Sequence, residues 1–128
     1  MSLPNFMCLG AAKSGTTTLY DILRQHSDIY IPSFKEPHFF DIPQNFENGL
    51  QWYEKTYFNK ADRKIIADFT PTYLFDLEAP KRIFESLGAD LKFLVIIRNP
   101  VDRAYSHYLH SKRDHHEIES FEKSLELE

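Results

Sequence analysis

The stretch that decides the fold is LGAAKSGTTTLYDIL, residues Leu9–Leu23. The residues just before it, 5–9, are mostly apolar and lead to Gly10, as a short buried strand does. Apolar side chains then recur at helical spacing over Thr17–Gln25, so the sequence predicts a strand, a glycine loop and a helix. In such a unit the backbone N–H groups of the loop and of the helix N-terminus converge on an anion, whose charge the helix dipole favours. The stretch therefore indicates an anion-binding loop.

The position of the lysine separates this loop from that of a nucleotide triphosphatase. Gly10 and Gly15 have the spacing of the motif G-x-x-x-x-G-K-[ST], in which the lysine reaches the β- and γ-phosphates and the next hydroxyl holds Mg²⁺. Here Thr16 follows the second glycine, and the lysine is Lys13. An ordinary strand-to-helix turn capped by a threonine is the alternative to an anion site. If the loop binds an anion, the residues that hold it are Lys13, Ser14, Gly15, Thr16, Thr17 and Thr18.

The composition is that of one globular domain, residues 1–128, and argues against several classes of partner. The chain is 42% hydrophobic and 27% charged, with a net charge of −4. We therefore expect neither a nucleic acid nor an anionic membrane as a partner, and any anion site must be built locally. No run approaches the roughly 20 apolar residues that cross a bilayer. Because Cys8 is the one cysteine, an internal disulfide is excluded, and we expect a reducing, cytoplasmic location.

The remainder of the chain alternates between segments typical of strands and of helices. We expect strands over residues 28–32, 64–69 and 91–98, helices over 49–58, 79–88 and 101–112, a further helix from 121, and a long ordered loop over 33–48. This alternation predicts an α/β fold of three layers, with a parallel sheet flanked by helices on both faces and joined by right-handed crossovers. Three or four strands are few for such a sheet, so we expect the N-terminal portion of a longer domain.

Two segments carry clear packing signals. The run LKFLVIIR, residues 91–98, is almost wholly apolar and rich in β-branched side chains, which predicts a central strand buried on both faces. In the helix that follows, we expect Tyr105, Tyr108 and Leu109 to face inward.

The sequence favours a site that works without a metal ion. A triphosphatase strand usually ends in an aspartate that helps to hold Mg²⁺, whereas the strand over 91–98 ends in Arg98. An arginine there indicates a second phosphate that is neutralised by charge. His110, His115 and His116 lie near acidic residues, but their spacing is not that of a metal site, and a solvated helix end is the better interpretation.

Three segments, in the same order, resemble those of the sulfotransferases that use 3′-phosphoadenosine-5′-phosphosulfate (PAPS). GAAKSGTTTL resembles their 5′-phosphosulfate loop, in which a lysine precedes the second glycine. IIRNPVDRAYSHY resembles their 3′-phosphate motif, which would make Arg98 and Ser106 the residues that bind that phosphate. KEPHFFD is similar to a loop of the heparan sulfate 3-O- and N-sulfotransferases and their bacterial relatives, in which a glutamate is the catalytic base. The match would make Glu36 that base.

The resemblance implies a P-loop sulfotransferase domain that transfers a sulfuryl group from PAPS to a hydroxyl or amine of a carbohydrate or small molecule, with no metal required. Glu36 would take the proton of the acceptor, and Lys13 would stabilise the charge on the leaving group. His38 and Asp41 match acceptor-site residues of the 3-O enzymes, where they would bind the substrate or orient Glu36. A structural role suits His38 equally well, and Asp41 could simply cap a turn.

The segment that follows the strand over 64–69 departs from the heparan enzymes. They have Glu-Lys before a Thr-Pro turn, whereas this chain has Asp68 and Phe69, so the acid is kept and a positive charge is lost. A polyanionic glycosaminoglycan favours a basic cleft, so the identity of the acceptor stays open. Of Phe39 and Phe40, which either line the acceptor pocket or bury the loop, we expect one to be buried.

Two other functions are compatible with the glycine loop. One is a P-loop nucleotide kinase-like enzyme with a shifted lysine, which Thr16 and Arg98 disfavour. The other is an inactive nucleotide-binding module, because the segment that closes over adenine in the family lies beyond residue 128. The sequence predicts no oligomeric state.

Overall fold

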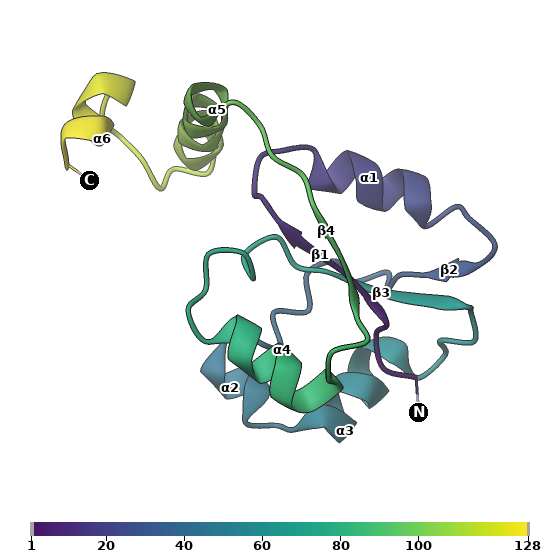
Figure 1. The fold of residues 1–128 in the computed structure, drawn as a ribbon. Coiled ribbons are helices and arrows are strands. Elements are labelled where there is room, and N and C mark those ends of the chain that lie inside the picture. The colour runs from purple at the N-terminus through teal and green to yellow at the C-terminus, as the bar shows by residue number, and fades with distance from the viewer. Residues whose placement is uncertain (1, 128) are drawn as a thin grey trace.

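The computed structural model describes residues 2–127 and confirms the alternation of strands and helices (Figure 1). The loop expected over 33–48 contains one short helix, and the helix expected over 49–58 starts as an α-helix and continues as a π-helix. In chain order the elements are β1 (Phe6–Gly10), α1 (Thr16–Leu23), β2 (Ile29–Tyr30), α2 (Pro43–Phe46), α3 (Leu50–Tyr53), the π-helix η1 (Glu54–Phe58), β3 (Ile65–Phe69), α4 (Ala79–Leu87), β4 (Lys92–Val95), α5 (Pro100–Arg113) and α6 (Phe121–Leu127).

The four strands form one parallel sheet in the order β2-β3-β1-β4. In the register of β1, Cys8 lies opposite Phe69 of β3 on one side and Leu94 of β4 on the other. α1 covers one face, and α2, α3 and α4 gather on the other, so the three predicted layers are present (Figure 1). The glycine loop follows β1 at the carboxyl end of the sheet, where α/β folds place their ligand sites.

The segment predicted to be the central strand lies at an edge of this sheet. β4 extends only over Lys92–Val95 and pairs with β1, so that β1 and β3 take the middle positions. Phe93 is 52% exposed and Ile97 is 84% exposed, so within residues 2–127 this run is not buried on both faces. An apolar, β-branched run specifies a strand, but the order of strands depends on pairings distant in sequence, which the run does not encode.

Each face of the sheet has its own apolar cluster, because successive side chains of β1 point to opposite faces. Cys8 packs against Tyr20 of α1 and Phe69 of β3 on one face. Met7 belongs to the cluster on the other face. The fully buried aromatic members of that second cluster are Phe39, Phe40, Tyr53, Phe58 and Tyr73.

The loop before α2 is anchored by its two phenylalanines. Phe39 and Phe40 are both fully buried, where only one was expected to be. The Phe39 ring stacks on Tyr53 with centroids 4.3 Å apart and planes 14° from parallel, and the Phe40 ring meets Tyr73 edge-on at 5.7 Å. Such pairs add stability beyond the area that they bury. The loop over 33–42 is therefore fixed from beneath by the second core cluster.

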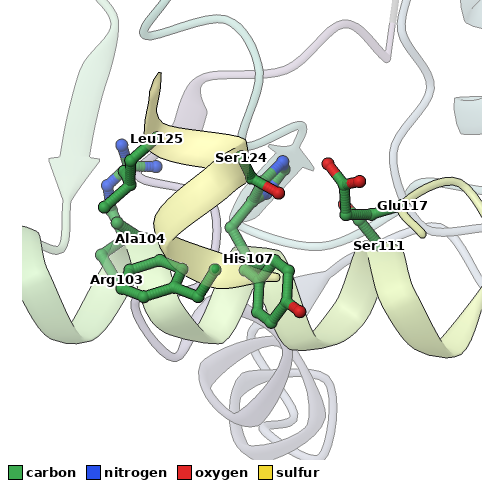
Figure 2. Close-up of a pocket in the computed structure, with 9 residues that line it drawn as sticks. Arg103, Ala104, His107, Ser111, Glu117, Ser124 and Leu125 are labelled. Carbon is green, nitrogen blue, oxygen red and sulfur yellow. The ribbon is translucent and has the colours of Figure 1, made fainter. Parts of the chain in front are cut away.

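α5 and α6 lie beyond the carboxyl ends of the strands (Figure 1). Of the three residues predicted to face inward on α5, Tyr105 and Leu109 are 48% and 47% exposed within residues 2–127, and Tyr108 is half-buried. The aromatic side of α5 instead meets α6, where Phe121 packs on Tyr105 at 5.2 Å and on Tyr108 at 5.4 Å. The two helices border a groove of about 300 Å³ (Figure 2). Within residues 2–127, no helix combines the length and apolar character needed to cross a membrane.

Candidate active site

The loop between β1 and α1 presents hydrogen-bond donors that have no partner in the protein. Lys13 (φ 62°) and Gly15 (φ 94°) both have left-handed backbone conformations, as in the nests of backbone N–H groups that bind anions. No side chain caps the first turn of α1, since Gly15 is its N-cap residue. The buried Ser14 hydroxyl makes no hydrogen bond within residues 2–127. Because an unpaired buried polar group is costly, this donor set suits a ligand oxygen.

The structure brings Arg98 to this loop, but neither Arg98 nor Ser106 lines the cleft described next. Arg98 Nη1 donates a hydrogen bond to the Lys13 carbonyl oxygen at 3.2 Å. Ser106 is half-buried on α5 and is not among the residues that line the cleft described next. Two other residues of α5, His107 and His110, lie there instead. His107 also borders the groove between α5 and α6 (Figure 2).

A cleft of about 500 Å³ connects the glycine loop with the aromatic loop over 33–42. Four parts of the chain that are distant in sequence contribute to it, all at the carboxyl end of the sheet. They supply Lys13, Thr16 and Thr17 from the glycine loop and α1, Lys35 and Glu36 from the aromatic loop, Thr72 from the turn after β3, and His107 and His110 from α5. The structure thus brings the predicted base and the predicted phosphosulfate loop into one cavity.

Glu36, His38 and Asp41 form one connected chain of charges. His38 Nε2 lies 3.3 Å from Glu36 Oε2, and His38 Nδ1 lies 2.9 Å from Asp41 Oδ2. The Thr72 hydroxyl donates to the same Asp41 oxygen at 2.5 Å and lies 3.2 Å from His38 Nδ1. The predicted base Glu36 and the predicted acceptor-site residues His38 and Asp41 therefore lie together, with the histidine in contact with both carboxylates.

The charges in this chain stabilise one another. Hydrogen bonds to Asp41 and Glu36 raise the pKa of His38 to about 10, so the imidazole is protonated at neutral pH. The hydrogen bond from His38, followed by that from Lys35, lowers the pKa of Glu36 to about 2. Burial raises the pKa of Asp41, but hydrogen bonds from His38 and Thr72 outweigh it and lower the pKa overall. His38 is thus a cation that holds two ionised carboxylates.

Lys35 joins the aromatic loop to the first turn of α1. Its Nζ lies 3.0 Å from Glu36 Oε1 and donates a hydrogen bond to the Thr17 hydroxyl at 2.6 Å. Desolvation, followed by repulsion from Arg113, lowers the pKa of Lys13 on the other side of the cleft. Two lysines and one glutamate therefore converge beside the glycine loop, which is the charge pattern that an anion and a proton-donating acceptor need in one site.

The backbone that carries Glu36 and His38 is strained. Their φ angles are 62° and 50°, in the left-handed region that residues other than glycine avoid. Such conformations cost about 1 kcal/mol or more each and persist only where surrounding contacts hold them. Tyr57 donates a hydrogen bond to the Pro37 carbonyl at 3.3 Å and Asn45 donates one to the His38 carbonyl at 2.9 Å. Strain of this kind is typical of functional loops.

The sequence analysis gave no role to three polar residues of the cleft, Lys35, Thr72 and His107. Lys35 could have been found, because it directly precedes Glu36 in the segment that carries the resemblance. Thr72 had a weaker signal, since it follows β3 at the carboxyl end of the sheet. His107 is one of several histidines on an exposed helix, and nothing in the sequence distinguishes it from the others. Its place in the cleft becomes evident only from the structure. Among residues 2–127, no three His, Cys, Asp or Glu side chains are grouped as metal ligands.

Comparison with known proteins gives a consistent result. The family model described as "Sulfotransferase domain" matches residues 3–127. Human heparan sulfate glucosamine 3-O-sulfotransferase 3B1 is 37% identical over 120 residues, which is 94% of this chain, and human heparan sulfate glucosamine 3-O-sulfotransferase 6 is 40% identical over 105 residues, or 82%. The crystal structure of a sulfotransferase from Alicyclobacillus acidocaldarius matches 98% of this chain with a TM-score of 0.86 at 36% sequence identity.

The chain spans only part of each of these relatives. It covers 30% of the length of either human enzyme and 56% of the bacterial chain. The matched part includes every residue of the cleft described above, so the comparison concerns the candidate site as well as the fold.

Proposed function

The chain belongs to the sulfotransferase domain family, and we propose that the protein transfers a sulfuryl group from PAPS to a hydroxyl or amine of a carbohydrate. The observation that carries the proposal is that a single cleft is lined both by Lys13, Thr16 and Thr17 of the glycine loop and α1 and by the ionised carboxylate of Glu36. A kinase-like function is not favoured, because the family model and the relatives are sulfotransferases and the loop lacks the lysine after its second glycine.

The donor set of the glycine loop suits the phosphosulfate group. Lys13, the unpaired Ser14 hydroxyl and the first turn of α1 would hold it, together with Gly15 and the hydroxyls of Thr16, Thr17 and Thr18. Arg98, beside the same loop, would bind the 3′-phosphate with Ser106 of α5. When bound, PAPS supplies the sulfuryl group and a phosphate leaving group. No metal is required, since Lys13 and the helix N-terminus would stabilise the charge that develops.

Glu36 would accept the proton of the acceptor hydroxyl or amine. At neutral pH it is ionised and held by His38 and Lys35. The hydrogen bond from His38 is the main cause of its low pKa of about 2, and Lys35 contributes less, so this base is ionised throughout the neutral range. Asp41 Oδ1 is buried and makes no hydrogen bond within residues 2–127, which suits an acceptor hydroxyl as its donor. His38 would orient both carboxylates.

The cofactor is tested by calorimetry with the full-length protein. We expect 3′,5′-adenosine bisphosphate to bind without a metal and more tightly than ATP with Mg²⁺. The reverse order would contradict the assignment and favour a nucleotide kinase-like enzyme.

The reaction is tested by transfer of labelled sulfate from PAPS. Heparan sulfate is the first acceptor to use, because the relatives are named for it. A panel of neutral saccharides tests whether the loss of a positive charge at Phe69 has changed the preference. Binding of the bisphosphate without transfer to any acceptor would identify an inactive nucleotide-binding module instead.

The role of Glu36 is tested with Glu36→Gln, which keeps the shape of the side chain and removes its basicity. We expect loss of transfer by roughly 100-fold or more, with bisphosphate affinity nearly unchanged. Equal losses of transfer and of affinity would show that Glu36 serves the fold of the loop and is not the base.

A further inference from the structure

Asp68 is the centre of a buried hydrogen-bond network beneath the candidate active site. The residue is fully buried near the end of β3, and three hydroxyls donate to its carboxylate. The Thr70 hydroxyl lies 2.6 Å from Oδ1, and the hydroxyls of Tyr53 and Tyr73 lie 2.5 and 3.0 Å from Oδ2. None of these residues lines the reaction cleft. A buried carboxylate is costly to desolvate, and here three hydroxyl donors offset that cost.

The Tyr73 hydroxyl connects this network to the aromatic loop. A phenol has one proton to donate, and here it goes to Asp68, which leaves the oxygen free to accept. The oxygen accepts hydrogen bonds from the backbone N–H groups of Phe39 at 3.1 Å and Phe40 at 3.4 Å. These are the two residues that follow the strained His38. Asp68 thus orients the hydroxyl that fixes the backbone carrying the candidate catalytic residues.

The turn after β3, which contains Tyr73, makes a second contact with the aromatic loop. Thr72, next to Tyr73, donates a hydrogen bond to Asp41, the carboxylate at the far end of the charge chain. The segment after β3 therefore holds both the backbone after His38 and the side chain that orients it. Tyr53 resembles Tyr73 in two respects, because its hydroxyl also donates to Asp68 and its ring is equally buried. It differs in that, within residues 2–127, its hydroxyl makes no hydrogen bond to the loop backbone.

We propose that Asp68 and Tyr73 are positioning residues for sulfuryl transfer, which fix the strained loop so that Glu36 meets the acceptor at the correct place beside the glycine loop. The inference rests on the proposed function for its catalytic part. Displacement of a catalytic group by about 1 Å costs on the order of 100-fold in rate, so loss of this anchor should lower kcat far more than it lowers binding.

The decisive comparison is between Tyr73→Phe and Tyr53→Phe in the full-length protein. Each variant removes one buried hydroxyl that donates to Asp68, and each keeps its ring, so the loss of that donor is common to both. Only Tyr73→Phe removes the hydrogen bonds to the loop. With heparan sulfate as acceptor, we expect Tyr73→Phe to lower kcat roughly 10- to 100-fold and Tyr53→Phe to lower it less than about threefold, with bisphosphate affinity unchanged in both.

Two substitutions of Asp68 test whether this carboxylate orients the Tyr73 hydroxyl. Asp68→Asn keeps an oxygen that can accept from the Tyr73 hydroxyl and should retain most of the activity. Asp68→Ala leaves three buried hydroxyls without an acceptor and should lose as much kcat as Tyr73→Phe. If Asp68→Ala does not fold, the comparison of Tyr73→Phe with Tyr53→Phe still tests the proposal.

A second measurement does not depend on the reaction. Hydrogen–deuterium exchange of the peptide over residues 34–41 should be faster in Tyr73→Phe and unchanged in Tyr53→Phe, because only the first loses the bonds that protect the Phe39 and Phe40 amides. Equal exchange and equal kcat in the two variants would overturn the inference. If the wild-type protein transfers no sulfate, the proposed function fails, and the exchange experiment alone decides whether Asp68 and Tyr73 hold the loop.

Discussion

Replacement of Asp68 by asparagine should change how the stability of the protein depends on pH. Burial raises the pKa of this carboxyl to about 6 from 3.8, against the hydrogen bonds from Thr70, Tyr53 and Tyr73, which lower it. A group whose pKa is higher in the folded state binds its proton more tightly there. Its contribution to the free energy of unfolding is fully present below pH 3.8 and is lost as the pH rises through 6.

The magnitude follows from the difference between the two pKa values. About 2 pH units at 1.36 kcal/mol each give about 3 kcal/mol in all, and about 2 kcal/mol of it should be lost between pH 4 and pH 7. No discount for solvent is needed, because Asp68 is fully buried. Glu36 and Asp41 have lowered pKa values and act in the opposite direction, so the total stability is not a clean measure. The difference between the wild type and the variant removes their contributions.

The assay is urea unfolding of the wild type and of Asp68→Asn at intervals of half a pH unit across this range. Asparagine fills the same space and does not titrate. We expect the stability of the wild type relative to the variant to fall by about 2 kcal/mol as the pH rises, with no change in the m-value. Parallel stability curves for the two proteins would refute the argument, since they would mean that Asp68 titrates alike in the folded and unfolded states.

Three further predictions concern the glycine loop and the residues around it. Gly10→Ala should lower stability by roughly 1 to 3 kcal/mol in the same assay, because a Cβ there would lie 2.7 Å from the Pro71 carbonyl at a backbone φ of 148°. Lys35→Met should raise the pKa of Glu36, so the acid limb of the kcat/KM profile should move to higher pH by about one unit; an unmoved limb would contradict the contact as the cause. Arg98→Ala should weaken bisphosphate binding about tenfold in calorimetry, and Arg98→Lys less, whereas equal affinities would remove Arg98 from the site.

The parts of the fold that the sequence predicted well depend on local pattern. The strand at Phe6–Gly10, the glycine loop and α1 follow from apolar spacing and two glycines, and the helix expected over 101–112 is present as α5. The order of the strands does not follow from local pattern. The run that contains β4 has the composition of a central strand, and within residues 2–127 it pairs with β1 alone; which segments pair is not encoded in the run itself.

The candidate site likewise has residues that a local motif predicts and supporting contacts that only the structure shows. A short motif predicts Glu36, His38 and Asp41 as site residues, and the structure places His38 in contact with both carboxylates. That Asp68 supports them was not foreseeable, since β3 is separated from the loop by some 30 residues and the link passes through the hydroxyl of one tyrosine. The left-handed backbone at Glu36 was equally hidden, because nothing in the residue type indicates it.

The contacts that fix Glu36 also lower its pKa, so as the proposed base it would contribute to the rate through its position more than through its proton affinity. His38 and Lys35 bring its pKa to about 2, some 5 units below neutral pH, where a base matched to the reaction would lie. Orientation can contribute as much as roughly 7 to 11 kcal/mol to a rate, which exceeds what a few pKa units of basicity supply. A site built this way depends on position more than on proton affinity. Loosening the loop through Tyr73 should therefore harm transfer more than the gain in basicity from Lys35→Met improves it.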